Sequence, residues 1–134
     1  MNRFRISSLV VFLFSLLLLS FTGCSPKAEG TYEGFCENQT YGGKAQIILI
    51  LKLDGNDVTG YINITGNLGG SAPINGLIEK DRISFSSDAG EGMPITWMGV
   101  IEGEQISGQY RVSANQRLKQ QGVQDQAGIW AVRK

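Results

Sequence analysis

The sequence predicts an all-β protein, a single eight-stranded antiparallel up-and-down β-barrel. A seven-residue pattern (aliphatic, acidic, three polar, aliphatic, hydroxyl) occurs at 53–59, 78–84 and 101–107. If its two central residues form a tight turn, the aliphatic residues face each other across a β-hairpin. Gly55 and Gly103, as first turn residues, suit a type II′ turn. The spacing of the copies fits one repeated hairpin unit, and 18 Gly with only 3 Pro favour a turn-rich β protein.

Eight strands are predicted in order from alternating apolar and polar residues, β-branched content, and Gly, Asn or Asp at the breaks. The second strand is the most apolar stretch after the N-terminal segment, and the fifth is short. The predicted strands are 30–37, 45–53, 57–65, 71–79, 82–87, 93–102, 105–113 and 128–133. Three breaks are tight turns, and the four longer connections are 38–44, 66–70, 88–92 and 114–127.

A meander of eight strands leaves two long edges unless it closes on itself, and closure makes an up-and-down barrel. Steps of two from the hairpin pairs identify the side chains that face inward. Nearly all are apolar or Gly: Ile47, Leu49, Leu51, Leu53, Val58, Gly60, Ile62, Ile64, Ile74, Gly76, Ile78, Ile83, Phe85, Ile95, Trp97, Gly99, Ile101, Ile106, Gly108, Tyr110 and Val112.

The third hairpin places Gly99 opposite Gly108, and Trp97 opposite Tyr110 one level further from the turn. One interpretation is a pocket floored by the glycines and lined by the two aromatic rings. The other is that the glycines permit sharp strand coiling and the rings fill the barrel. A barrel of eight strands is just wide enough for either a packed core or one small ligand.

Two further local features follow from the pattern. Ile48, Ile50 and Leu77 face outward by alternation, so part of the wall is apolar and is predicted to form a protein contact. Ser113 and Gln116 have capping-box spacing and good helix formers follow them, which predicts a short helix ending near Gly122.

The N-terminal segment is typical of a secretory signal, which we assign to residues 1–23. Two arginines precede an apolar run that ends near Leu19, and this run is shorter than the roughly 20 residues that span a bilayer. We expect cleavage rather than a transmembrane helix. The remaining chain then divides into a tether, residues 24–29, and a barrel domain, residues 30–134.

At Gly23-Cys24 the chain resembles the lipobox of bacterial lipoproteins, with Phe21 in place of the usual aliphatic residue three positions before the cysteine. The resemblance implies a diacylglyceryl group on the Cys24 sulfur and a further acyl chain, such as palmitate, on its amine. Two or more acyl chains make membrane anchoring stable. The resemblance implies a cell-envelope location, and Ser25 implies the outer membrane where the cell has one.

The barrel itself is similar to the avidin and streptavidin family. The similar pieces are Gly30-Thr31-Tyr32, Val58-Thr59-Gly60-Tyr61 and Ser107-Gly108-Gln109-Tyr110. The family's biotin site uses an Asn where this chain has Gly34, and an Asp on the last strand, where residues 128–134 have none. The resemblance therefore implies a fold and no biotin site.

Charge and composition exclude several classes of function. Loss of Arg3 and Arg5 with the signal leaves 10 basic against 12 acidic residues and no basic run, so nucleic acid is not an expected partner. With no histidine, the chain lacks the commonest general base and metal ligand. No nucleotide or metal motif is present either. We predict no enzyme activity, no metal site and no cofactor.

The chain has two cysteines, which would suit a disulfide in an exported protein. If Cys24 is lipidated, however, Cys36 has no partner within the chain. Cys36 is then either a small buried thiol or a reactive or intermolecular one.

In a meander, alternate connections emerge at alternate ends. The three tight turns and the lipidated terminus therefore lie at one end, the turn end, and the four long connections at the other, the loop end. We predict that the loop end faces away from the membrane and either binds a partner protein or inhibits a hydrolase. The alternative is a small apolar ligand inside the barrel. The predicted contact residues are Tyr41, Asp88, Glu91, Trp97, Tyr110 and Arg117.

Overall fold

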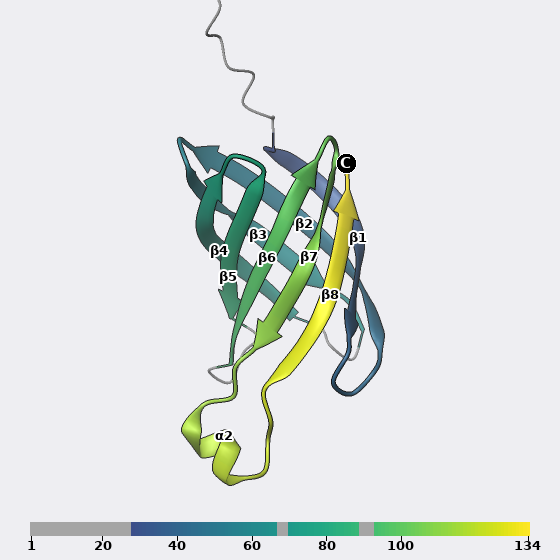
Figure 1. Ribbon diagram of the computed structural model, residues 1–134, viewed down its shortest axis with the longest axis vertical. Helices are drawn as coiled ribbons and strands as arrows, with labels where there is room; N and C mark the ends of the chain where they lie inside the picture. Colours follow the sequence, from purple (N-terminus) through teal and green to yellow (C-terminus); the bar gives the residue numbers. More distant parts are fainter. Residues whose placement is uncertain (1–27, 67–69, 89–92) are drawn as a thin grey trace, which may run out of the picture.

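The computed structural model describes residues 28–66, 70–88 and 93–134. These residues form eight antiparallel strands that close into a barrel in sequence order, with a short helix in the last connection (Figure 1). The predicted fold class is confirmed. The elements are β1 (Gly30–Asn38), β2 (Lys44–Asp54), β3 (Asp57–Ile64), β4 (Gly70–Glu79), β5 (Arg82–Asp88), β6 (Pro94–Glu102), β7 (Gln105–Val112), α2 (Gln116–Gln120) and β8 (Gln126–Arg133).

The barrel closes where β1 pairs with β8. Cys36 lies opposite Trp130, and Asn38 lies opposite Gly128. Each of the eight described strands therefore has a hydrogen-bonded neighbour on both sides. Closure satisfies the backbone groups that an open eight-stranded sheet would expose at its two edges.

The three tight hairpins have the predicted register. Leu53 pairs with Val58, Ile78 with Ile83, and Ile101 with Ile106. The first turn residue has a positive φ in each hairpin, at Gly55 (60°), Lys80 (57°) and Gly103 (62°). The second turn residue has no positive φ in any of the three, which is the type II′ pattern.

The second residue of each tight turn also bonds to a neighbouring strand. Its carbonyl accepts a hydrogen bond from Ile78 in the first hairpin (Asn56 O, 2.9 Å) and from Ile101 in the second (Asp81 O, 2.7 Å). In the third hairpin the donor is the Lys134 amide, at 3.0 Å from Glu104 O. The turns are thus part of the hydrogen-bonded wall.

Inward and outward faces alternate along the strands as predicted. The burial of β2 alternates strictly over Ala45 to Leu51, and β5 buries Ile83, Phe85 and Ser87 while exposing Ser84 and Ser86. The predicted outward residues Ile48, Ile50 and Leu77 are exposed. Every predicted inward residue is buried or half-buried.

Gly108 shows why some strand positions have no side chain. A Cβ atom there would overlap the carbonyl oxygen of Met98 on β6, so the backbones of β6 and β7 approach more closely than an L side chain permits. Gly99 faces Gly108 across the hairpin. A Cβ on Gly99 would lie 2.9 Å from Cζ2 of Trp130, so the ring of Trp130 occupies the space that a side chain on Gly99 would need.

The chain enters and leaves the barrel at the turn end. Ala28 is buried, and its carbonyl accepts a hydrogen bond from the Tyr32 hydroxyl at 2.7 Å. The C-terminal residue Lys134 bonds to the third tight turn. In Figure 1 both lie at the end opposite α2, as predicted.

The predicted helix is present, but its start is not where the capping-box pattern placed it. Asn115 is the N-cap, and its side chain accepts from the Leu118 amide at 2.9 Å. Ser113 instead donates its backbone N–H to Pro94 and continues the β6–β7 ladder. Because sheet hydrogen bonds hold Ser113, the cap moves to the next side chain that can accept a backbone N–H. Gly122 (φ 85°) closes the helix as expected.

Candidate functional site

Trp97 and Tyr110 meet inside the barrel. Their ring centroids are 4.9 Å apart, and the exposed fractions are 0% and 4%. Phe85 stacks on Trp97 at 5.9 Å, and Trp130 stands edge-on to both, at 5.7 and 5.6 Å. These four residues form an aromatic cluster that fills the level next to the paired glycines, so the rings pack the interior there.

Polar partners fix both tryptophans of the aromatic cluster. The Trp97 indole N–H donates to the buried hydroxyl of Ser87 at 2.9 Å. The Trp130 indole N–H lies 3.2 Å from each of two carbonyl oxygens, those of Met98 and Gln109. A buried indole N–H without a partner would cost about 1–3 kcal/mol, so these contacts stabilise the packed arrangement.

Sequence analysis missed Ser87 and Trp130. Ser87 ends the predicted fifth strand, two residues after Phe85, and is inward by the same alternation, but the predicted inward set stopped at Phe85 because Ser87 is polar. Trp130 is on the last strand, which no tight hairpin ties to a neighbour. Its inward direction follows from the pairing of β8 with β7, where it lies opposite Gly108.

Burial also shifts the pKa of Tyr110, a member of the aromatic cluster, and of Cys36, which lies opposite Trp130. Burial, together with the smaller effects of the charges of Cys36 and Glu37, raises the pKa of Tyr110 to about 12. Burial raises the pKa of the Cys36 thiol. Cys36 is buried, as one of the two interpretations predicted, and a thiol held neutral is a poor nucleophile.

At the loop end, Asn38 organises the β1–β2 connection. Its side chain is buried, and its Oδ1 accepts from the backbone N–H groups of Thr40 and Tyr41, both at 2.9 Å. Its Nδ2 donates to Oε1 of Gln126 at 2.7 Å. This bonding holds the turn so that Tyr41 projects outward with 63% of its surface exposed.

The first connection is joined to the start of β8, where the last connection ends. Ala127 donates its N–H to Thr40 Oγ1 and accepts at its carbonyl from the Gln39 N–H, both at 2.9 Å. Within the last connection, Asp125 accepts from the Ala114 N–H at 2.9 Å and forms an ion pair with Lys119 at 3.2 Å. The bond from Ala114, followed by that from Lys119, lowers the pKa of Asp125. Hydrogen bonds thus hold the first connection against β8, and the last connection is held by its own internal bonds.

The other predicted contact residues lie apart from the aromatic cluster. Arg117 is exposed on α2. Asp88 is exposed at the end of β5 opposite Pro94, beside a shallow depression of about 330 Å³ on the outer wall. Cys24 and Glu91 lie outside the described residues. Of the predicted set, therefore, Trp97 and Tyr110 are in contact inside the barrel, and Tyr41 and Arg117 are displayed on the first and last connections.

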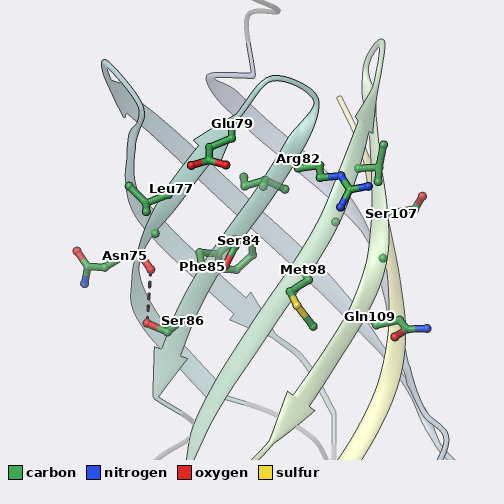
Figure 2. Close-up of a pocket in the computed structure, with 15 residues that line it drawn as sticks. Asn75, Leu77, Glu79, Arg82, Ser84, Phe85, Ser86, Met98, Ser107 and Gln109 are labelled. Atoms are coloured by element: carbon green, nitrogen blue, oxygen red, sulfur yellow. Dashed lines mark hydrogen bonds between the residues drawn. The ribbon is translucent and has the colours of Figure 1, made fainter.

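A larger groove, of about 770 Å³, lies on the outer wall over β4 to β7 (Figure 2). Leu77, Met98 and Val100 supply apolar side chains, and serine, asparagine and glutamine side chains surround them. The backbones of Gly76, Gly99 and Gly108 also line it. Sequence analysis identified Leu77 as an apolar outward residue but did not predict the groove.

The described residues contain no group of three or more His, Cys, Asp or Glu side chains placed to hold a metal ion. In the same part of the chain, no helix has the length and apolar character needed to cross a membrane.

The chain matches no model of a known protein family, and a search of curated proteins finds no relative.

Proposed function

We propose that the protein is a lipid-anchored lipoprotein of the bacterial cell envelope whose barrel binds a partner protein through its loop end. The anchor is supported by the signal-like N-terminus that leads into Cys24. The described chain starts at the turn end, where Tyr32 bonds to Ala28. Four peptide units from Cys24 to Ala28 span at most about 14 Å, so the turn end would face the membrane and the loop end would point away from it.

One observation carries the binding proposal, namely that the loop end is held in place before any partner arrives. Asn38, Thr40 and Asp125 fix the backbone of the first and last connections. Fixed loops lose little conformational entropy on binding, which favours affinity. The surface they display carries Tyr41 and Arg117, and Tyr and Arg are enriched among the residues that dominate protein–protein binding energies.

A partner protein is favoured over a ligand inside the barrel because of the aromatic cluster. An interior ligand next to Gly99 would have to displace Trp130, whose indole N–H bonds to the strand backbone. Displacement would leave that donor unpaired and disrupt the contacts of the four rings. A partner that docks on the loop end leaves the core intact. An enzyme of the envelope, such as a hydrolase inhibited by the loops, is one class of partner that such a surface fits.

The proposal is tested with the full-length lipoprotein in its own host. We expect Tyr41→Ala combined with Arg117→Ala to abolish recovery of the native partner after chemical crosslinking, because both side chains are on the proposed surface. The measurement is quantitative mass spectrometry of the crosslinked complexes. The matched control combines Asn56→Ala, Lys80→Gly and Glu104→Ala at the turn end, and it should recover the partner at the wild-type level. The opposite pattern would refute the loop-end assignment.

The anchor is tested separately. Cys24→Ser should release the protein from the membrane fraction and remove metabolic labelling with palmitate, because the acylated sulfur would be lost.

Native mass spectrometry of the protein from its host tests the interior-ligand alternative. A small molecule that co-purifies and quenches the fluorescence of Trp97 and Trp130 would favour that alternative over partner binding.

A further inference from the structure

The groove on the outer wall has a row of side chains that crosses four strands. Leu77 lies opposite Ser84, Ser84 opposite Met98, and Met98 opposite Gln109. Leu77 is 52% exposed and Met98 is 45% exposed, the highest values among large hydrophobic side chains on the described strands. An apolar centre with a polar border is the composition of a protein–protein interface.

The next row, toward the turn end, carries charge. Arg82 lies opposite Glu79 on one side and opposite Val100 on the other. In Figure 2 the Arg82 side chain extends away from Glu79, over β6 and toward Ser107. Within the part of the chain that the structure describes, the Arg82 side chain forms no ion pair or hydrogen bond. Its guanidinium donors are thus available to a carboxylate that approaches from the β6–β7 side.

The shape of the groove favours a macromolecule over a small ligand. Small-molecule sites bury most of the ligand surface in a concavity, whereas this groove is open along the outer wall. A partner cannot add a strand here, because each described strand already has two neighbours. The partner must therefore dock through side chains. Met98 adapts to irregular apolar shapes because its side chain is unbranched and flexible.

We propose that the groove over β4 to β7 binds an amphipathic acidic segment of a partner protein. The segment places apolar side chains on Leu77, Met98 and Val100, and a carboxylate on the Arg82 guanidinium. This inference extends the proposed protein-binding function to a second surface that does not include the loop end. Leu77 belongs to the outward residues for which the sequence predicted a protein contact.

The test uses the full-length lipoprotein in detergent micelles and three dye-labelled synthetic peptides of equal length. Each peptide has two leucines one helical turn apart, with Glu, Gln or Lys beside them. Fluorescence anisotropy should show that the Glu peptide binds about tenfold more tightly than the Lys peptide. Arg82→Glu should reverse this order, because the charge that selects the carboxylate is inverted. Met98→Glu should weaken the Glu peptide at least tenfold. Tyr61→Ser, on the outer wall of β3 away from the groove, should change nothing.

Several outcomes would overturn the proposal. If Arg82→Glu leaves the order of the peptides unchanged, the guanidinium does not select the ligand. If no peptide binds and Met98→Glu converts a dimer into a monomer, the groove accepts a second copy of this chain. If only a fatty acid or detergent binds in a way that depends on Met98, the groove accepts a small amphipathic molecule. A wild-type far-UV circular dichroism spectrum must show that each variant is folded. If Met98→Glu is unfolded, Ser84→Trp, which fills the groove, replaces it.

Failure of peptide binding is distinguishable from failure of the loop-end proposal. The loop-end variants are scored by recovery of the native partner from the host, and neither Tyr41 nor Arg117 lines the groove. If the native partner depends on Tyr41 and Arg117 while no peptide binds to the groove, the proposed function stands and the groove proposal fails.

Discussion

At the scale of single residues, Trp130 links the core to the wall. Its ring occupies the space that a side chain on Gly99 would need, and its indole N–H bonds to carbonyl oxygens on two other strands. Ser87 has the corresponding role for Trp97. Each tryptophan of the aromatic cluster therefore has a hydrogen bond at its indole N–H. This bond fixes the orientation of the ring, which burial of apolar surface alone does not determine.

The burial of Tyr110 makes the stability of the barrel sensitive to alkaline pH. In the unfolded chain a tyrosine loses its proton near pH 10, but in the fold the pKa of Tyr110 is about 12. Between these values the unfolded state binds fewer protons, so the free energy of unfolding falls as pH rises, by at most about 1.4 kcal/mol per pH unit for this group. Urea unfolding at a series of alkaline pH values measures the slope. Tyr110→Phe should have a shallower slope, and an identical slope would show that Tyr110 does not contribute.

At the scale of elements, the three tight hairpins repeat one geometry with one exception. The first turn residue is glycine in two of them and Lys80 in the third, and Lys80 is the only non-glycine residue with a positive φ among the described residues. The Lys80 turn still has the same register and the same bond from its second residue to the next strand. The surrounding sheet therefore imposes the turn on a residue that does not favour it.

Replacing Lys80 by glycine should stabilise the protein. A side chain at positive φ costs about 1–2 kcal/mol, and glycine avoids this cost but loses about 0.5–1 kcal/mol through the entropy of the unfolded chain. We expect Lys80→Gly to raise the free energy of unfolding by up to about 1 kcal/mol, measured by chemical denaturation. Gly103→Lys makes the converse change in the third hairpin and should destabilise. A destabilised Lys80→Gly variant would mean that the lysine side chain contributes more than the strain costs.

At the scale of the whole molecule, closure depends on places where neighbouring strands approach too closely for a side chain. Gly34 and Gly128 lie at the junction of β1 and β8, and a Cβ on either would overlap the backbone of the opposite strand. Gly108 has the same relation to β6. These glycines permit the coiling that brings the first strand to the last.

Gly108→Ala should destabilise the barrel by about 1–3 kcal/mol, the usual range for overpacking, because the new methyl group collides with a backbone carbonyl. The measurement is the midpoint and slope of urea unfolding, followed by tryptophan fluorescence. Gly70→Ala is the matched control. Its new methyl group has no atom within 4 Å and its φ is not positive, so it should be neutral or slightly stabilising. Equal effects of the two substitutions would refute the role of close strand approach.

The sequence by itself determined the strands, their order, the inward faces of β2 to β7 and the turn end. These follow from local alternation and repeated turn signals, which act over a few residues and are confirmed by the pairing of Leu53 with Val58 and its two equivalents. Burial of Cys36 was one of two interpretations left open, and the fold decided between them. The contact residues at the loop end remain predictions.

Only the tertiary structure decided the features that depend on contacts outside the three tight hairpins. Trp130 lies against Gly99 because β8 pairs with β7 in a register that places Trp130 opposite Gly108, and the long connection between these strands carries no tight-turn signal for that register. Asn115 caps α2 because the sheet already uses the Ser113 amide. The groove beside Met98 exists because residues on four strands share one curved face. Long-range pairing and curvature depend on the closed barrel as a whole, and no local sequence pattern encodes them.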